Sequence, residues 1–331
     1  MLSRGFLFPD NVIRCIGALA LLCAFVVRGA GAVAADFKCG FQVIPIAKLP
    51  DARTPRLEFF DPSSNTFVVV QGIPDSGAIT ALQLPSGRFV RSKLPRNVVP
   101  ADVGNGFVLL SNGVVLDEWL RKVAQVGGAI AITSRGCVLK VGLNGIAGQH
   151  SFLRRGLCNK AQFRWPSGFN PAPESGGIWA VSADHRDVAL IDYGGLRHVW
   201  NFKAAADNWP LRTNPGNIQS FRSLGPNAVI GGIEAIARVR GDRRSLVIHA
   251  KSGLGVLDAV LRTDGLVVFG ATDAQGRAFL GIDSDRPKSD YTTAIDWTRI
   301  DVAHFVNGPK DSVLVEGLGG IVYKVTPTCL K

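Results

Sequence analysis

Short apolar runs separated by glycine-containing turns cover most of the chain between residues 41 and 325. A unit of apolar run, turn and apolar run begins at residues 78, 129, 178, 227, 266 and 312. Apolar runs of this length, bounded by Gly, Asn and Asp, are typical of strands in β-hairpins. Asn112-Gly113 and Asp264-Gly265 supply the positive φ that tight hairpin turns require. The pattern therefore predicts an all-β protein.

The spacing of these units predicts a β-propeller. Their starts are on average about 47 residues apart, and a four-stranded propeller blade has ~40–50 residues. Val115-Leu116-Asp117 resembles Val256-Leu257-Asp258, which follows it in the chain by three such periods. We predict a six-bladed propeller of four-stranded blades, with its two ends meeting in one blade. Seven smaller blades and a pair of β-sandwiches are the alternatives.

The first 35 residues have the layout of a secretory signal peptide. Arg4 and Arg14 give a positive start, the apolar run 15–27 follows, and small residues lead to Ala35. A 13-residue apolar helix is roughly 20 Å long, short of the roughly 30 Å hydrocarbon core, so an uncleaved anchor is the weaker alternative. We expect residues 1–35 to be removed. Residues 36–331 are then a single exported domain, secreted or periplasmic, without a membrane span.

Four cysteines remain after this removal: Cys39, Cys137, Cys158 and Cys329. An even number in an oxidising compartment predicts two disulfides, and four cysteines allow three pairings. We favour Cys137–Cys158 together with Cys39–Cys329, because the second bond would join the two ends of the ring. The cysteines and histidines lack metal-site spacing, so no metal or cofactor is expected.

Charge gives a weaker indication of partners. The chain has 37 basic and 26 acidic residues, a formal net charge of +11. A positive field favours anionic partners, although a solvated surface explains the same balance. The densest basic cluster consists of Arg238, Arg240, Arg243 and Arg244. It is a candidate for binding phosphate or uronate groups, and the alternative is a solvated loop. We expect no nucleic-acid partner.

Two segments, 163–177 and 201–217, exceed the length of a hairpin turn. Long loops on a compact scaffold often carry function. Trp165 and Trp209 could stack on sugar rings or contact a protein partner, with Arg164 and Arg212 adding charge. The alternative is that these tryptophans fill gaps between blades.

No sequence motif identifies a reaction. Phosphate-loop, zincin and nucleophile-elbow motifs are absent from the sequence. His185 lies in an Asp184–Asp187 charged cluster between two predicted strands, where an exposed turn is the expected structure. We expect a monomeric binding scaffold that takes an anionic ligand, a glycan or a protein partner on the loops of one face. The alternative is a hydrolase or lyase acting on carbohydrate or a small ester, which would gather three or more acidic or histidine side chains at the channel mouth.

Overall fold

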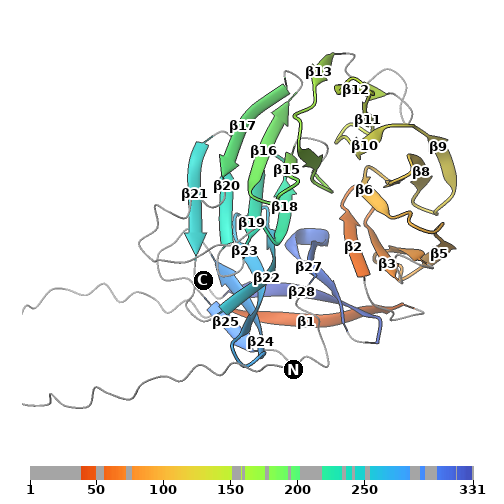
Figure 1. Cartoon of the computed structure of the whole chain (residues 1–331). Coiled ribbons are helices and arrows are strands. Elements are labelled where there is room, and N and C mark those ends of the chain that lie inside the picture. Colours follow the sequence, from red (N-terminus) through yellow and green to blue (C-terminus); the bar gives the residue numbers. More distant parts are fainter. Residues whose placement is uncertain are drawn as a thin grey trace, which may run out of the picture. The chain divides into compact units, whose positions relative to one another are not determined.

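Seven antiparallel sheets of four strands each make up the described part of the chain (Figure 1). The computed structural model describes residues 39–49, 56–71, 77–150, 158, 161–175, 179–192, 195–201, 218–232, 236–240, 243–249, 254–283, 291–294, 304–317 and 319–329. Residues 37–331 form one compact unit. Within the described ranges, no helix has the length and apolar character needed to cross a membrane.

Six sheets contain four strands that are consecutive in the chain, and we number these blades in chain order. Blade 1 has β2 (Arg56–Asp61), β3 (Thr66–Gln71), β4 (Ala78–Gln83) and β5 (Phe89–Lys93). Blade 2 has β6 (Pro100–Gly104), β7 (Phe107–Leu110), β8 (Val114–Asp117) and β9 (Lys122–Gln125). Blade 3 has β10 (Ala129–Ile132), β11 (Val138–Val141), β12 (Ile146–His150) and β13 (Gln162–Arg164).

The next three blades repeat this order. Blade 4 has β14 (Phe169–Pro171), β15 (Trp179–Ser182), β16 (Asp187–Asp192) and β17 (Gly195–Asn201). Blade 5 has β18 (Ser220–Leu224), β19 (Asn227–Gly231), β20 (Ile236–Arg240) and β21 (Arg243–His249). Blade 6 has β22 (Leu254–Leu261), β23 (Val267–Asp273), β24 (Ala278–Asp283) and β25 (Tyr291–Ala294).

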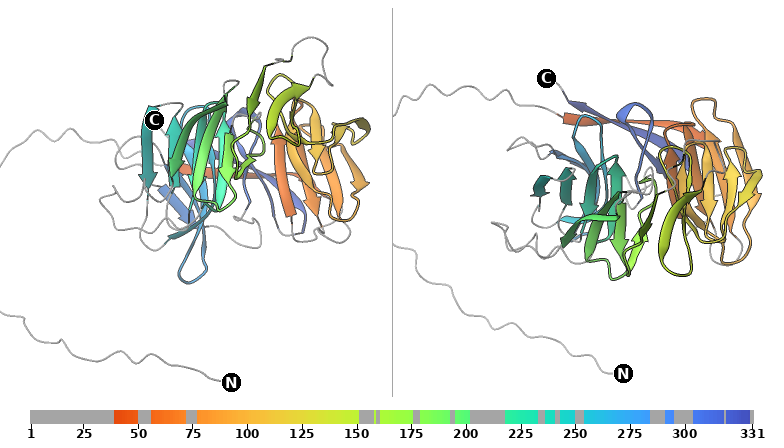
Figure 2. Two further views of the ribbon diagram at one scale, coloured as in Figure 1. Left: turned by 45° about the horizontal axis from the view of Figure 1, so that its top comes forward. Right: turned by 90° about the horizontal axis from the view of Figure 1, so that it is seen from above.

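Blade 7 is shared between the two ends of the domain. Its strands β26 (Val306–Asn307), β27 (Val313–Glu316) and β28 (Ile321–Cys329) are completed by β1 (Cys39–Lys48), which pairs with β28 (Figures 1 and 2). A 3₁₀ turn, Pro309–Asp311, joins β26 to β27. The expectation that the ends meet in one blade is confirmed.

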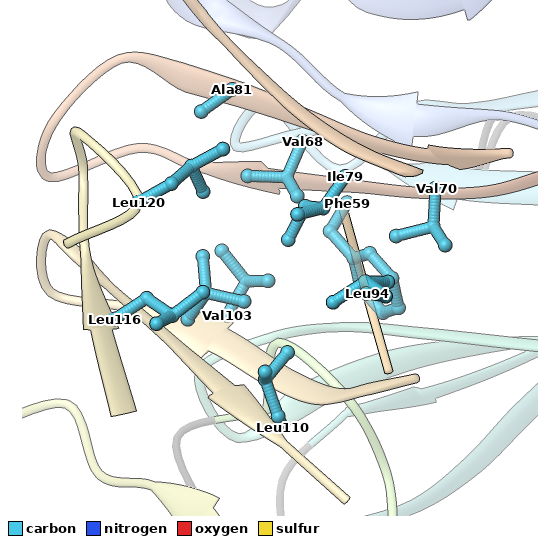
Figure 3. Close-up of a cluster of buried hydrophobic side chains, with 11 residues drawn as sticks. Phe59, Val68, Val70, Ile79, Ala81, Leu94, Val103, Leu110, Leu116 and Leu120 are labelled. Atoms are coloured by element: carbon cyan, nitrogen blue, oxygen red, sulfur yellow. The ribbon is translucent and has the colours of Figure 1, made fainter. Parts of the chain in front are cut away.

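Apolar side chains pack each blade against the next around the ring. One cluster joins β3 and β4 of blade 1 to β6–β8 of blade 2, and Figure 3 shows Val68, Ile79 and Val103 pointing toward one another in it. Corresponding clusters join every following pair of blades, and the last contains Val322 of blade 7 and Phe67 of blade 1. Alternate residues of a strand face opposite sides of its sheet, so each blade supplies apolar surface to both neighbours. The clusters therefore close the ring.

The predicted propeller is confirmed, but the number of blades is seven, the alternative, and not six. The fixed period of about 47 residues missed blade 2 because this blade takes up little chain: β6 begins at Pro100, and blade 3 already begins with β10 at Ala129. Blade 6 takes up much more chain, since β22 begins at Leu254 and β26 of blade 7 begins at Val306. The proposed repeat of Val115-Leu116-Asp117 in Val256-Leu257-Asp258 is also wrong. The first tripeptide lies in the third strand of its blade and the second in the first strand. A single period fails when the connections differ this much in length.

The Cys137–Cys158 disulfide is present, with 5.9 Å between the two Cα atoms. It connects the start of β11 to the segment between β12 and β13 within blade 3. Cys39 and Cys329 are direct Cα partners in the register of β1 and β28. Their side chains lie outside the described residues, so the terminal disulfide stays a prediction.

Candidate functional site

A cavity of about 480 Å³ lies among the first strands of blades 4, 5 and 6 and the start of blade 7. The first strand of blade 6, β22, contacts those of blades 5 and 7, β18 and β26, so residues far apart in the chain meet here. The polar residues of the lining are Asn170, Ser182, His185, Gln219, Ser220, Arg222, Asp258 and His304. Phe221, Ile218 and Leu257 supply apolar surface to the same cavity. This mixture is typical of a site for a small polar ligand.

His185 reaches the cavity from the turn between β15 and β16. The backbone of His185 has a φ of 58°, and the Ser182 hydroxyl donates to Asp184 Oδ1 at 2.6 Å, which organises the turn. The Ile218 N–H donates to the His185 carbonyl at 2.8 Å and ties this turn to the start of blade 5. Within the described structure the His185 ring makes no hydrogen bond, so both ring nitrogens are available to a ligand.

Arg222 on β18 is the cation of the cavity. Its Nε donates to the Phe305 carbonyl at 3.0 Å, Nη1 to the Phe221 carbonyl at 3.3 Å, and Nη2 to Asp258 Oδ2 at 3.2 Å. A guanidinium has five N–H donors, so two of them remain without a partner in the described structure. The side chain is 19% exposed, and it lines the cavity. Arg222 can therefore donate to a bound ligand while it is held in place.

Carboxylates keep Arg222 charged. Burial acts against the charged guanidinium, but the charges of Asp258, Glu174 and Glu58 outweigh that effect and raise its pKa above the usual value. The Asp258 carboxylate is itself 3% exposed. Its Oδ1 accepts the Ala259 N–H at 2.8 Å and its Oδ2 accepts the Phe305 N–H at 2.8 Å. Asp258 thus joins blades 6 and 7 and also holds Arg222.

Glu174 lies next to the cavity wall, after β14, and connects three blades. Its Oε1 accepts the Phe60 N–H of blade 1 at 2.6 Å, and its own N–H donates to Asp102 Oδ1 of blade 2 at 2.7 Å. Burial raises the pKa of Glu174 to about 7 against the opposing charge of Arg222. Burial also raises the pKa of Asp102 to about 7. These two carboxyl groups are thus poised to change protonation close to neutral pH.

The residues proposed from the sequence lie away from this cavity or outside the described part. Arg164 is exposed on β13, and Trp165 packs among the apolar residues of blades 3 and 4. Arg238 is only 3% exposed, and its Nη1 donates to the Gly265 carbonyl, so it does not belong to a surface cluster. The side chains of Arg240, Arg243 and Arg244 lie outside the described residues, as do Trp209 and Arg212 entirely.

Sequence reasoning placed His185 in an exposed turn and missed the rest of the cavity. Asp258 did carry a signal, because an acidic residue inside the apolar strand LGVLDAVL must have buried hydrogen-bond partners. Asp102 in PADVG carries the same signal. No cluster of three or more potential metal ligands occurs among the residues that the structure describes.

The chain matches no protein-family model and no curated protein. Solved structures do resemble it. The Pan2 WD40 domain of Neurospora crassa aligns with a TM-score of 0.56 at 9% identity, covering 86% of this chain and 94% of that one. BBS1N in complex with ARL6DN aligns with a TM-score of 0.50 at 8% identity, covering 87% and 96% of the two chains. At these identities the comparison shows a shared propeller fold.

Proposed function

We propose that this protein is an exported binding propeller whose cavity takes a carboxylate-bearing sugar, such as a uronic acid unit of a polysaccharide. The observation that carries the proposal is Arg222, which keeps two unused N–H donors at the cavity while its other donors fix its position. A held guanidinium with free N–H donors can bind a carboxylate group. The signal-like first 35 residues and the basic composition fit export and an anionic ligand.

The remaining lining suits the rest of a sugar ring. The side chains of Asn170 and His185 have no hydrogen-bond partner in the described structure and can bind hydroxyl groups. Phe221 offers an apolar surface for the C–H face of the ring, and its own ring lies 5.6 Å from that of Trp179. Trp209 and Arg212 precede Ile218 of the cavity wall in sequence, so we retain them as further ligand contacts.

Binding is favoured over catalysis by the hydrogen bonds of Asp258. The cavity has three acidic or histidine residues in its lining, which is the feature expected of an enzyme. Both oxygens of Asp258, however, accept backbone N–H groups, and Asp102 makes the same two kinds of bond in blade 2. This repetition in another blade indicates a structural role for the Asp258 carboxylate, which favours binding over a role in orienting a histidine of the cavity as a catalytic base.

Calorimetric titration with glucuronate oligosaccharides and with matched neutral glucose oligosaccharides tests the proposal. We expect saturable binding of the acidic series and an affinity at least about tenfold lower for the neutral series. His185→Ala and Asn170→Ala should each weaken the acidic series, because each removes a hydrogen-bonding group from the cavity. Gln275→Ala is the matched control, since Gln275 lies in the corresponding exposed turn of blade 6, outside the cavity lining.

Three results would contradict the proposal. The first is equal affinity for the acidic and neutral series, which would show that Arg222 does not select a carboxylate. The second is unchanged affinity of the acidic series for the His185 and Asn170 variants, which would place the ligand elsewhere. The third is absence of binding to either series, which would reject a sugar site.

A second candidate is a hydrolase or lyase of the same polysaccharide, and Glu174 is the observation that favours it. A carboxyl group with a pKa of about 7 beside Arg222 can give or take a proton near neutral pH. Release of shortened or unsaturated products from the acidic oligosaccharides would indicate this activity. Glu174→Gln should then abolish product release and keep binding, whereas a binding protein releases no product in either form.

A further inference from the structure

A second surface lies at the seam between blades 7 and 1, away from the cavity. Ile44 on β1 is 40% exposed and Phe89 on β5 is 46% exposed, high values for side chains of this size and kind. Both belong to the outermost strands of their blades. Ile46 and Leu84, close to them in the chain, pack against the buried cluster that joins these two blades. The exposed apolar side chains thus extend the core of the seam to the surface.

The strand registers place Ile44 and Phe89 on facing sides of their blades. Phe89 is the direct partner of Leu82, which belongs to the seam cluster, so Phe89 is on the side of blade 1 that faces blade 7. Ile44 is the partner of Lys324, which lies two residues from Val322 of the same cluster. Ile44 is therefore on the side of blade 7 that faces blade 1. We call Ile44, Phe89, Arg91, Lys93 and Lys324 the seam surface.

The charge of the seam surface is uniformly positive. Exposed and less exposed residues alternate along β5, which puts Phe89, Arg91 and Lys93 on one face of the strand. Lys324 adds a further cation from blade 7. No Asp or Glu occurs in β1, β5 or β28. A second copy of the chain would bring like charges together, so self-association through this surface is disfavoured, whereas an acidic partner is complementary.

We propose that the seam surface docks an extended acidic segment of a partner protein, added as a strand along β5. As the last strand of its sheet, β5 presents an edge at which such a segment can pair. Side chains of an added strand face the sheet surface at every second position. An antiparallel segment would therefore place acidic residues beside Lys93 and Arg91 and an apolar residue beside Phe89. The recognised pattern is acidic-x-acidic-x-apolar. This periodicity favours an extended peptide over a lipid surface, which imposes no register.

Fluorescence anisotropy with a labelled acetyl-Thr-Glu-Thr-Glu-Thr-Val-Thr amide tests the proposal on the full exported chain. We expect saturable binding that weakens at least about tenfold when both glutamates are replaced by lysines. Lys93→Glu should weaken binding of the acidic peptide and strengthen binding of the lysine peptide, and Phe89→Ser should weaken both. Lys122→Glu is the matched control, because Lys122 is an exposed cation on β9, the edge strand of blade 2.

The outcomes distinguish a peptide-docking edge from a lipid-binding surface and from general charge attraction. No saturation up to about 1 mM peptide, or equal loss in the Lys122 and Lys93 variants, would overturn the proposal. Binding of phosphatidylglycerol vesicles that depends on Phe89 and Lys93, without peptide binding, would identify a lipid surface and overturn it as well. His185→Ala should leave peptide binding unchanged, because His185 lines the cavity of blades 4 to 6.

Discussion

Asp102 and Asp258 occupy the same position in blades 2 and 6, and each ties its blade to the next. Oδ1 of each accepts the N–H of the following residue, at 2.9 Å and 2.8 Å. Oδ2 of each accepts an N–H from the next blade, that of Ile132 at 2.7 Å and that of Phe305 at 2.8 Å. A shift in strand register lies beside each aspartate. The two carboxylates differ in their further partners, because Asp258 binds Arg222 and Asp102 binds the Glu174 N–H.

Replacement of these aspartates by asparagine should have unequal effects on stability. Asp102→Asn loses one acceptor for a buried N–H, which costs about 1–3 kcal/mol. Asp258→Asn also leaves the buried guanidinium of Arg222 without its hydrogen-bonded carboxylate, so we expect a loss of roughly 3–5 kcal/mol. Urea denaturation at neutral pH measures both values. A larger loss for Asp102→Asn would show that Arg222 does not depend on Asp258.

The fold could be predicted from the sequence because the hairpins are local. Alternating apolar residues and turn glycines mark each pair of strands, and the ends had to meet to leave no open edge in the ring. The blade count failed at blade 2, whose first strand begins at Pro100, close in the chain to Ala129 at the start of blade 3. The V-L-D similarity reinforced the error, since it matched a third strand with a first strand.

The cavity could not be predicted in the same way. Asn170, Arg222 and His304 come from different blades, and nothing in a single sequence says which loops meet at the axis. Arg222 is fixed mostly by backbone carbonyls, which leave no motif. The signal that the sequence did contain was the presence of acidic residues within buried strands. These residues are Asp102, which binds the Glu174 N–H, and Asp258, which binds Arg222.

Stability should fall as the pH rises from about 4.5 to about 7. Burial raises the pKa of Asp102 from 3.8 to about 7 and that of Glu174 from 4.5 to about 7. Between these values the folded state keeps protons that the unfolded state has released, so a rising pH favours unfolding. Urea midpoints at about pH 5 and about pH 7 measure the effect.

Glu174→Gln should flatten this pH dependence, because the variant has no proton to release at that position. Carboxyls with lowered pKa values act in the opposite direction, but only below about pH 4; they are Asp117, Asp184, Asp273 and Asp311. Glu118→Gln, at the β8–β9 turn, is the control and should retain the slope of the unmodified protein. If the Glu174 variant kept the same dependence of stability on pH, the loss of stability with rising pH would have to come from other groups.

Loss of the Cys137–Cys158 bond should destabilise the domain. The two cysteines are 21 residues apart, and in the chain-entropy model a bond across such a loop stabilises by about 3 kcal/mol. The double variant Cys137→Ala with Cys158→Ala should lose about that amount in urea denaturation. Reduction of the unmodified protein should produce a larger loss, because it would also open the predicted Cys39–Cys329 bond. Equal stability of the double variant and the unreduced protein would show that the Cys137–Cys158 bond contributes nothing.

A bond between Cys39 and Cys329 should close the ring covalently. These residues are direct partners in the antiparallel pairing of β1 and β28, a separation at which cysteines can bridge. Peptide mapping of the protein without reduction should find the two terminal peptides joined. Alkylation of Cys39 in the unreduced protein would contradict the pairing.

Trp165 should stabilise the seam of blades 3 and 4 and contribute nothing to sugar binding. It packs with Ala131 and Leu139 of blade 3 and with Ala180 and Ala189 of blade 4. Its Nε1 donates to the Phe169 carbonyl at 2.9 Å, which fixes the ring in that gap. Trp165→Ala should therefore lower the free energy of unfolding by about 3 kcal/mol, with glucuronate affinity unchanged when measured below the melting temperature.

Arg164→Ala is the control for Trp165→Ala, because Arg164 is the neighbouring residue and is exposed. Its stability should stay within about 0.5 kcal/mol of the unmodified protein. If Trp165→Ala instead weakened glucuronate binding and kept full stability, the ring would have to leave its place between the blades to meet a ligand. That result would support the prediction from the sequence that Trp165 stacks on a sugar ring. The packing of Trp165 between blades 3 and 4 would then not explain the presence of a tryptophan at this position.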